Sequence, residues 1–448
     1  MTGENNKKQQ RRRGVILTEV GLEKLQNAKI KAEQEENNGN RYTLESLSEK
    51  TGLAMDTLMK VFACESRVDR QTLRHCFKAF QLQLWNEDFF YPQMSSVEEN
   101  DCNLLSDLEL PEGQVSLTSQ FYIERPQIES ECYKAILKPG SLIRLKAPRR
   151  MGKSSLLARI IDHGIQNNCA AVSLSFQLAD TDLFQDLDKF LRWFCANISL
   201  NLKIENKVID YWDDIFGSKI SCKRYFEEYI LSTLETPLVL GLDDVDRLFE
   251  YPDLADNFFG LLRAWHEEAK NRDIWKKLRL IVVHSAEVYI PLKVNHSPFN
   301  VGIPITLPNF TTEQVQNLAK IYQLNWSLEN RENLMSLVGG NPYLLRLAMY
   351  NVSTSKIKLK ELLVSNYQAI SVVYGDHLQR QLWTLQQQNS DLLEAFKKVV
   401  FSSKPIELDL VQSMKLQSLG LVDFQDQQIV ISCRLYKQYF QQHFQGVV

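Results

Sequence analysis

Residues 141–161 read SLIRLKAPRRMGKSSLLARII, and they hold the strongest structural signal in the chain. A short apolar run from Leu142 to Leu145 is long enough for a strand, and the residues after Ser154 have the apolar periodicity of a helix. A tight loop and the triplet Gly152-Lys153-Ser154 lie between them. Such a triplet between a strand and a helix is typical of a phosphate-binding loop, the Walker A motif.

Each part of this loop has a physical task. A helix N-terminus offers unpaired N–H groups and the positive end of a dipole, which favours a polyphosphate. Gly152 lets the backbone approach the phosphates, Lys153 is expected to reach the β- and γ-phosphates of ATP, and Ser154 to hold Mg²⁺. Ala147 replaces the first glycine of the general pattern, which matters only if that position needs a positive φ. The predicted nucleotide contacts are Pro148, Arg149, Arg150, Met151, Gly152, Lys153, Ser154 and Ser155.

A second motif, PLVLGLDDVD, occupies residues 237–246. A fully apolar run that ends in carboxylates is how a buried parallel strand brings acid to the edge of a sheet, as in a Walker B motif. We expect Asp243 to hold Mg²⁺ through water. Asp244 stands where many ATPases place a catalytic Glu, and its shorter side chain predicts slow hydrolysis. A buried strand followed by an acidic helix start is the alternative, and it is weaker after a Gly-Lys-Ser triplet.

The composition sets outer bounds. The chain has 448 residues, enough for two to four domains, and its net charge of −3 argues against a surface that is basic throughout. The eight cysteines contain no CxxC pair, so we expect reduced thiols rather than disulfides or zinc. No signal peptide or membrane span is visible in the sequence, which predicts a cytoplasmic protein without a membrane partner.

The region before the phosphate-binding loop divides into three parts. Residues 1–14 are predicted to be a disordered basic tail, and residues 91–120 an acidic, polar linker. Residues 15–90 are predicted to be helical, with the spacing of a helix-turn-helix around Thr51-Gly52-Leu53. Only Thr57 and Lys60 on its second helix suit DNA contacts. We therefore favour protein contact for this domain, and DNA contact stays open as the alternative.

Residues 121–307 are predicted to be an α/β P-loop ATPase core. Apolar strands at 170–176, 278–283 and 303–307 join the two motif strands and alternate with helices. We expect one further strand to lie between the acidic strand and the phosphate-loop strand, as in additional-strand (ASCE, AAA-like) ATPases. Ser285 or His284, at the end of the strand at 278–283, is placed to sense the γ-phosphate, although a structural hydrogen bond explains His284 equally well. We take Ser285 as the catalytic candidate.

Two upstream residues, Tyr122 and Arg125, are candidates for the border of the adenine pocket; packing at the entrance of the domain is the alternative. Residues 308–353 are predicted to form a small helical lid, in which Gly339, Gly340 and Pro342 set the start of a helix. We also expect Pro342 to press on the adenine.

Residues 354–448 are predicted to be linking helices and a C-terminal winged helix, with helices at 392–400, 406–419 and 435–444 and a hairpin at 420–432. Basic residues are sparse in this winged helix, which favours protein packing over nucleic-acid contact.

Several separated stretches, in this order, carry a family resemblance. They are FYIERPQIESECYKAIL at 121–137, GSLIRLKAPRRMGKSSLL at 140–157, LVLGLDDVDRLFE at 238–250, LRLIVVHSAEVYIPL at 278–292 and LVGGNPYLLR at 337–346. Together they resemble the bacterial AAA-like domain family, which belongs to the signal-transduction (STAND) ATPases. The resemblance covers about 120–350 and continues to CRLYKQYF at 433–440.

The resemblance implies a nucleotide-controlled switch, with Gly340 and Pro342 matching the lid motif of the family and Ala147 fitting its loop. The N-terminal helix-turn-helix resembles the domain that accompanies such ATPases in multi-protein bacterial conflict systems. Together, the two resemblances imply a switch or scaffold that binds ATP and Mg²⁺, works through partner proteins and forms a nucleotide-dependent oligomer. A DNA-binding regulator or loader that uses both terminal domains is the other hypothesis.

Overall fold

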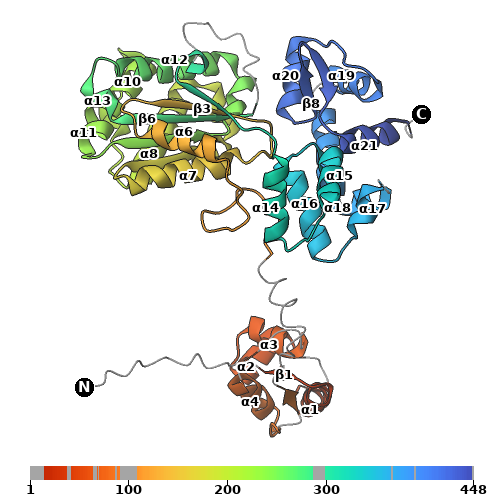
Figure 1. Cartoon of the computed structure of the whole chain (residues 1–448). Helices are drawn as coiled ribbons and strands as arrows, with labels where there is room; N and C mark the ends of the chain where they lie inside the picture. Colours follow the sequence, from red (N-terminus) through yellow and green to blue (C-terminus); the bar gives the residue numbers. More distant parts are fainter. Residues whose placement is uncertain are drawn as a thin grey trace, which may run out of the picture. The chain divides into compact units, whose positions relative to one another are not determined.

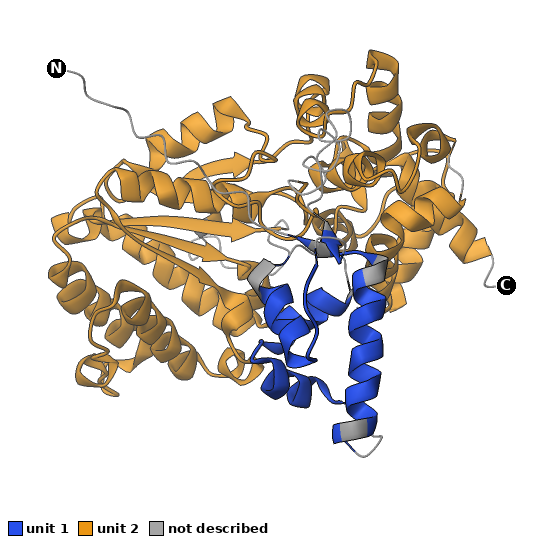
Figure 2. Cartoon of the chain, turned by 90° about the horizontal axis from the view of Figure 1, so that it is seen from below, with its two compact units in different colours: residues 1–107 blue, residues 108–448 orange. Residues whose placement is uncertain are grey.

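The computed structural model describes residues 15–37, 42–63, 68, 70–85, 88–90, 108–285, 298–364, 367–387 and 390–445. The chain divides into two compact units, residues 1–107 and 108–448, which Figure 2 colours separately. Each unit has a hydrophobic core of its own. The tail predicted at 1–14 and the first part of the predicted linker, 91–107, lie outside the described residues.

The first unit pairs helices with a small antiparallel sheet. Its core is built from apolar residues of α2, α3 and α4, among them Leu47, Leu58 and Phe77. A turn at Gly52 joins α2 to α3, as the sequence predicts. The helix-turn-helix class of this unit stays a prediction. The elements are β1 (Ile16–Leu17), α1 (Glu19–Glu36), α2 (Leu44–Thr51), α3 (Met55–Ala63), α4 (Arg70–Ala79) and β2 (Phe89–Phe90).

Figure 1 shows the sheet of the second unit, with β3 and β6 labelled. It is a five-stranded parallel sheet in the order β4-β5-β6-β3-β7. The strand β6 separates the acidic strand β5 from the phosphate-loop strand β3. This order confirms the predicted α/β P-loop ATPase core. The strands are β3 (Leu142–Lys146), β4 (Ala170–Ser175), β5 (Leu238–Asp243), β6 (Leu278–His284) and β7 (Ile303–Thr306).

Helices cover both faces of the sheet because the strand side chains alternate. Leu240 belongs to the cluster formed with α8, α10 and α12, whereas its neighbour Val239 belongs to the cluster formed with α6 and α7. On the same face as Val239, Gly241 allows α7 to lie close, since a Cβ there would come within 2.8 Å of Leu157 Cδ1. Close packing of α7 on β5 brings the phosphate loop to the acidic strand.

The helices of the second unit fall into a core set and a following set. The core set is α6 (Pro126–Ile136), α7 (Lys153–Gln166), α8 (Leu187–Leu202), α9 (Val208–Tyr211), α10 (Gly217–Arg224), α11 (Leu231–Thr233), α12 (Pro252–Glu268) and α13 (Asp273–Lys276), with short helices η1 (Phe176–Leu178), η2 (Thr181–Gln185), η3 (Tyr225–Ile230), η4 (Val245–Glu250) and η5 (Pro298–Asn300). The following set is α14 (Thr312–Ile321), α15 (Leu328–Val338), α16 (Pro342–Ser353), α17 (Leu359–Leu363), α18 (Tyr367–Gln387), α19 (Ser390–Phe401), α20 (Leu410–Ser418) and α21 (Arg434–Gln445), with the hairpin β8 (Val422–Gln425) and β9 (Gln428–Ile431).

The predicted start of the helix at 406–419 is wrong. Ile406 pairs with Ile429 as an isolated β-bridge, and α20 begins only at Leu410. The physical reason is the cap: a side-chain oxygen of Asp409 accepts hydrogen bonds from Val411 N at 2.9 Å and Gln412 N at 3.1 Å. Helices and a hairpin are thus present in this region, and its winged-helix class stays a prediction.

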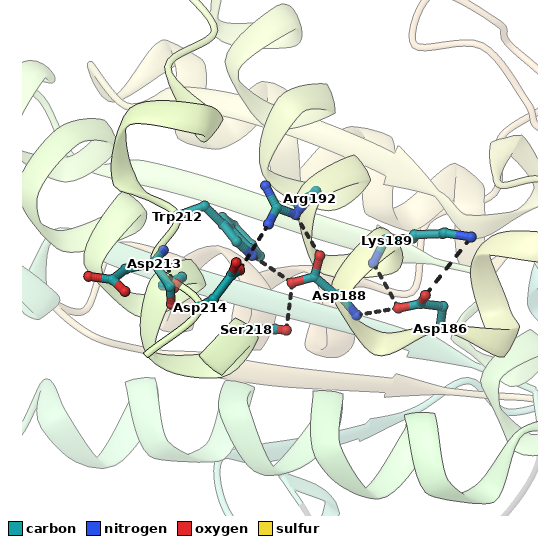
Figure 3. A network of polar contacts seen from close by, with 9 residues as sticks. Asp186, Asp188, Lys189, Arg192, Trp212, Asp213, Asp214 and Ser218 are labelled. Atoms are coloured by element: carbon teal, nitrogen blue, oxygen red, sulfur yellow. Dashed lines mark hydrogen bonds and ion pairs between the residues drawn. The ribbon is translucent and has the colours of Figure 1, made fainter. Parts of the chain in front are cut away.

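A polar network fixes the helices inserted between β4 and β5 (Figure 3). The carboxylate of Asp188 on α8 accepts from Trp212 Nε1, Ser218 Oγ and Arg192 Nε, each at 2.6 Å. Partial burial opposes ionisation of Asp188, but these hydrogen bonds outweigh it and lower its pKa. One carboxylate therefore connects α8 with the start of α10.

The longest described helix, α18, has 21 residues and carries Asp376 and Arg380. Within the described ranges, no helix combines the length and the hydropathy that crossing a bilayer requires.

Candidate nucleotide-binding site

A cleft of about 860 Å³ opens where β5, β6 and the loop after β3 end. Its walls come from the phosphate loop, the acidic segment after β5, the segment before α6 and helix α20. The lining residues are Gly113, Gln114, Arg149, Arg150, Gly152, Lys153, Ser154, Ser155, Ser175, Gln177, Asp243, Asp244, Asp246, Arg247, Glu250, Ser285, Lys415, Ser418 and Leu419. The cleft gathers most of the residues that the sequence singled out.

The backbone of the loop suits an anion. Gly152 has a φ of 95°, which favours glycine, and no heavy atom lies within 4 Å of the Cβ that another residue would add. The N-terminus of the 14-residue helix α7 follows directly. Ala147 does not have a positive φ, so alanine in place of the first glycine of the Walker A pattern introduces no backbone strain. Arg150, with a φ of 69°, takes up the tight turn instead.

Lys153 is buried in the floor of the cleft. Its Nζ donates to Ala147 O at 2.8 Å and to Pro148 O at 3.0 Å. Burial lowers the pKa of Lys153 to about 8, and the nearby carboxylates of Asp246 and Asp243 oppose that shift. The ammonium is therefore held in a desolvated place where the phosphate oxygens of a nucleotide would be strong partners.

Ser154 and Asp243 form the pair that suits Mg²⁺. Both residues line the cleft; burial is the main cause of the raised pKa of Asp243, and the neighbouring Ser154 hydroxyl opposes that shift. Hydroxyl and carboxylate oxygens are hard donors, and Mg²⁺ is commonly held by one or two protein ligands together with phosphates and water. The described residues contain no cluster of three or more His, Cys, Asp or Glu for a metal. The donor set thus fits a magnesium ion that arrives with a nucleotide.

The carboxylates beyond Asp243 are held in place by other strands. Asp244 has a φ of 57°, and its Oδ2 accepts from Ser175 Oγ at 2.8 Å. Asp246 accepts from the backbone N–H of Ser285 at 2.8 and 2.9 Å, which fixes the end of β6 in the cleft. His284 is buried with its ring 4.9 Å from that of Phe299. Sequence reasoning missed the roles of Ser175 and Asp246, which became visible only from these contacts.

Tyr122 and Arg125 make packing contacts. The Tyr122 hydroxyl donates to Glu129 Oε1 at 2.7 Å, and the Arg159 guanidinium lies 3.4 Å from the centre of its ring. Arg125 donates to Met151 O at 3.2 Å and to Pro308 O at 3.3 Å. These contacts agree with the packing alternative, and contact of either residue with adenine stays a prediction.

A model of the family described as AAA-like domain matches residues 110–442. The chain belongs to this family. The resemblance inferred from the sequence is thereby confirmed for the ATPase part, while the N-terminal resemblance lies outside the match.

Two solved structures and one sequence relative give further comparisons. The Walker-type ATPase of Pyrococcus abyssi shares the fold at a TM-score of 0.50 and 12% identity, over 75% of this chain and 99% of that one. A STAND protein with a tetratricopeptide repeat sensor from Pyrococcus horikoshii aligns at a TM-score of 0.34 and 14% identity, over 74% of this chain and 43% of that one. An uncharacterized WD repeat-containing protein of Synechocystis is 24% identical over 220 residues, which are 47% of this chain and 18% of the relative.

A second, smaller hollow of about 220 Å³ in the AAA-like chain lies between the phosphate loop, the lid helices and the C-terminal helices. Pro148 and Met151 line it from the loop, and Asn341 and Leu344 line it from the lid. Asn341 caps α16 and donates to Met151 Sδ at 3.5 Å. Pro342 is the first residue of α16 and is buried next to this hollow. The proline thus lies near the phosphate loop, and its contact with adenine stays a prediction.

The AAA-like core meets the C-terminal helices directly at the phosphate loop. Arg149 N donates to Ser418 O of α20 at 3.0 Å, and Lys415 also lines the cleft. The Arg150 guanidinium lies 4.6 Å from the ring centre of Tyr343 on α16. Sequence reasoning missed Lys415 and Ser418 as cleft residues, because nothing local in α20 indicates a nucleotide site.

A series of ring contacts in the AAA-like chain runs from Tyr343 on α16 to His377 on α18 and Tyr436 on α21. His377 on α18 lies 5.3 Å from the Tyr343 ring, and its Nε2 is 2.7 Å from the Tyr436 hydroxyl. Burial, with smaller contributions from Arg150 and Arg380, lowers the pKa of His377 to about 4. A neutral imidazole is therefore part of the contact between the lid and the last helix.

This histidine predicts a pH dependence of stability. An unfolded histidine titrates at about 6.5, so between about pH 4 and 6.5 the unfolded chain binds a proton that the folded chain does not. The free energy of unfolding should fall by about 3 kcal/mol as pH drops through this window, at about 1.4 kcal/mol per pH unit. Chemical denaturation at a series of pH values measures it. His377→Gln should remove most of the slope, whereas His163→Gln on α7 should keep it; an unchanged slope in His377→Gln would contradict the assignment.

Proposed function

We propose that this AAA-like protein is an ATP-binding switch that acts through partner proteins in signalling or in a conflict (defence) system. One observation carries the proposal: a single cleft combines the phosphate loop, the paired oxygens of Ser154 and Asp243, and residues of the C-terminal helix α20. Lys153 and the N-terminus of α7 are suited to the phosphates, and Ser154 with Asp243 to Mg²⁺. Bound Mg²⁺ would neutralise phosphate charge.

The cleft supports a switch because its walls come from different segments of the second unit. Arg149 of the phosphate loop donates to Ser418 on α20, and Arg150 of the same loop lies over the ring of Tyr343 on α16. A ligand shifts an equilibrium between two arrangements only by its differential affinity for them. Phosphates in the cleft lie where Lys415 and Ser418 line it, so ATP and ADP should stabilise different positions of the C-terminal helices.

We infer that hydrolysis is slow. Asp244 is the candidate to polarise the attacking water, but its carboxylate is engaged by Ser175 at 2.8 Å. It is also one methylene shorter than the Glu that many ATPases use. Ser285 lines the same cleft and is the candidate to sense the γ-phosphate. A slow cycle suits a switch whose output depends on which nucleotide is bound.

Small-angle scattering of the apo, Mg·ADP and Mg·ATP forms tests the switch. We expect the ADP and ATP forms to differ in compactness and in proteolysis between about 350 and 395. Pro342→Ala should weaken that difference with the fold intact, since this proline sets the start of α16 beside the phosphate loop. Pro252→Ala, at the first position of α12, is the matched control and should leave it unchanged. Identical profiles for all three wild-type forms would leave a static ATP-binding scaffold.

We propose protein rather than DNA as the partner of the first unit. Helix α3 exposes Met55 and Met59, at 45% and 50% of their full surface, and its last turn carries Lys60 as its basic residue. Methionine is common at adaptable protein-binding surfaces, whereas a DNA-reading helix needs cations. We expect a gel-shift titration with duplex DNA to give no tight complex. Tight binding that weakens steeply with salt would instead support a DNA-binding regulator.

A further inference from the structure

An ordered segment without helix or strand, residues 108–118, runs along helix α7 in the second unit, and we name it the strap. The sequence predicts these residues to be part of a featureless linker. The strap is nevertheless held by specific contacts at both of its ends. Its path brings two of its residues, Gly113 and Gln114, to the wall of the nucleotide cleft.

Helix α7 holds the C-terminal end of the strap, at Val115 and Ser116. Val115 N donates to Ser155 Oγ at 2.9 Å, and Ser155 is 3% exposed. One turn further along the helix, the Arg159 guanidinium donates to Val115 O at 3.2 Å and to Ser116 O at 2.8 Å. Ser155 directly follows the predicted magnesium ligand Ser154. The strap is therefore tied to the same helical turn that would hold the metal and the phosphates.

The other end of the strap contacts the lid. Leu108 packs against the cluster formed by the lid and C-terminal helices. The Glu109 carboxylate lies 3.8 Å from Arg346 Nη2 on α16 and accepts from Ser119 Oγ at 2.6 Å. The strap thus contacts both parts whose relative position the proposed switch would change.

Gln114 occupies a particular place beside the metal pair. It lines the large cleft, and it also lines an adjoining hollow of about 320 Å³ together with Ser154 and Asp243. Gln114 is exposed, and its carboxamide makes no hydrogen bond with the described residues. A free carboxamide offers both a donor and an acceptor, so it can bind a phosphate oxygen or a water of a hydrated metal ion.

We propose that the strap is a wall of the nucleotide site, in which Gln114 contacts the γ-phosphate and magnesium side of bound ATP. Docking of the strap on α7 and binding of Mg·ATP then stabilise each other. The proposal rests on the proposed ATP site and adds to it a residue and a segment from outside the two sequence motifs. It also gives the lid a second connection to the phosphates, through Glu109 and Arg346.

Hydrogen exchange of the full chain, with calorimetry, tests the proposal. In the wild type, Mg·ATP should slow exchange of the Val115 amide at least about tenfold, and ATP with EDTA should slow it less. Gln114→Ala should weaken Mg·ATP binding about five- to tenfold and keep the slow exchange of the nucleotide-free form, because the Ser155 bond remains. Glu112→Ala, another exposed strap residue, is the control and should bind like the wild type. Arg159→Met should speed exchange of residues 115 and 116 without nucleotide.

The outcomes separate the two proposals. Lys153-dependent binding of Mg·ATP, with strap exchange unchanged by nucleotide and normal affinity in Gln114→Ala, would overturn the role of the strap and leave the ATP site intact. Absence of any Mg·ATP binding in the wild type would reject both. Fast exchange at Val115 in the nucleotide-free wild type would show that the strap does not dock on α7 in solution, and it would overturn the inference by itself.

Discussion

Lys153→Ala should weaken binding of Mg·ATP by roughly 10- to 150-fold, which corresponds to a charge-assisted contact of about 1.5–3 kcal/mol. The reason is the position of the ammonium, which is buried at the floor of the cleft and held at 2.8 Å from Ala147 O. Alanine leaves the helix N-terminus in place but removes the only charge that the Gly-Lys-Ser triplet brings to the phosphates. Isothermal titration calorimetry with Mg·ATP measures the change.

The control removes the same charge elsewhere. Lys138 is an exposed lysine just before β3, and Lys138→Ala should bind Mg·ATP as the wild type does. Thermal unfolding without nucleotide checks that both variants are folded. Equal affinity of wild type and Lys153→Ala would remove the phosphate-binding loop from the proposed function.

Phe258→Ala should lower the free energy of unfolding of the second unit by about 3–5 kcal/mol, the usual cost of deleting a buried phenyl ring. Phe258 on α12 is fully buried and lies 5.2–5.6 Å, ring to ring, from Phe176, Phe190 and Phe194. The cavity would open between α12 and α8, on the face of the sheet to which Leu240 of β5 contributes. Urea denaturation followed by circular dichroism measures the loss.

An exposed phenylalanine of the same unit serves as the matched control for Phe258. Phe216 precedes α10 and is 56% exposed, so Phe216→Ala should change the free energy of unfolding by less than about 1 kcal/mol. A loss in Phe258→Ala no larger than that of Phe216→Ala would contradict the packing of α12 on α8. Losses of this size matter because a folded domain is stable by only about 5–15 kcal/mol.

Local patterns in the sequence determined the main elements of the ATPase core. The phosphate loop, the acidic strand and the lid helix α15 lie where periodicity, capping residues and glycines predict them. Those signals act between residues a few positions apart, so they can be recognised in one chain without its structure. The alternation of strands and helices likewise limited the sheet to a few parallel orders, and β6 lies between the acidic strand and the phosphate-loop strand as predicted.

Only the tertiary structure decided which distant residues complete the site. Ser175 reaches Asp244 from β4, Ser418 of α20 accepts from the phosphate loop, and Val115 docks on Ser155. Periodicity predicts the strand β4 and a helix around α20, but it does not specify which distant residue each of their polar side chains meets, and the strap has no periodic pattern at all. At the start of α20 a local and a distant contact act together, because Asp409 caps the helix while Ile406 pairs with Ile429 of β9 in a β-bridge. Contacts between chain segments far apart depend on the whole packed core, which is a property of the fold.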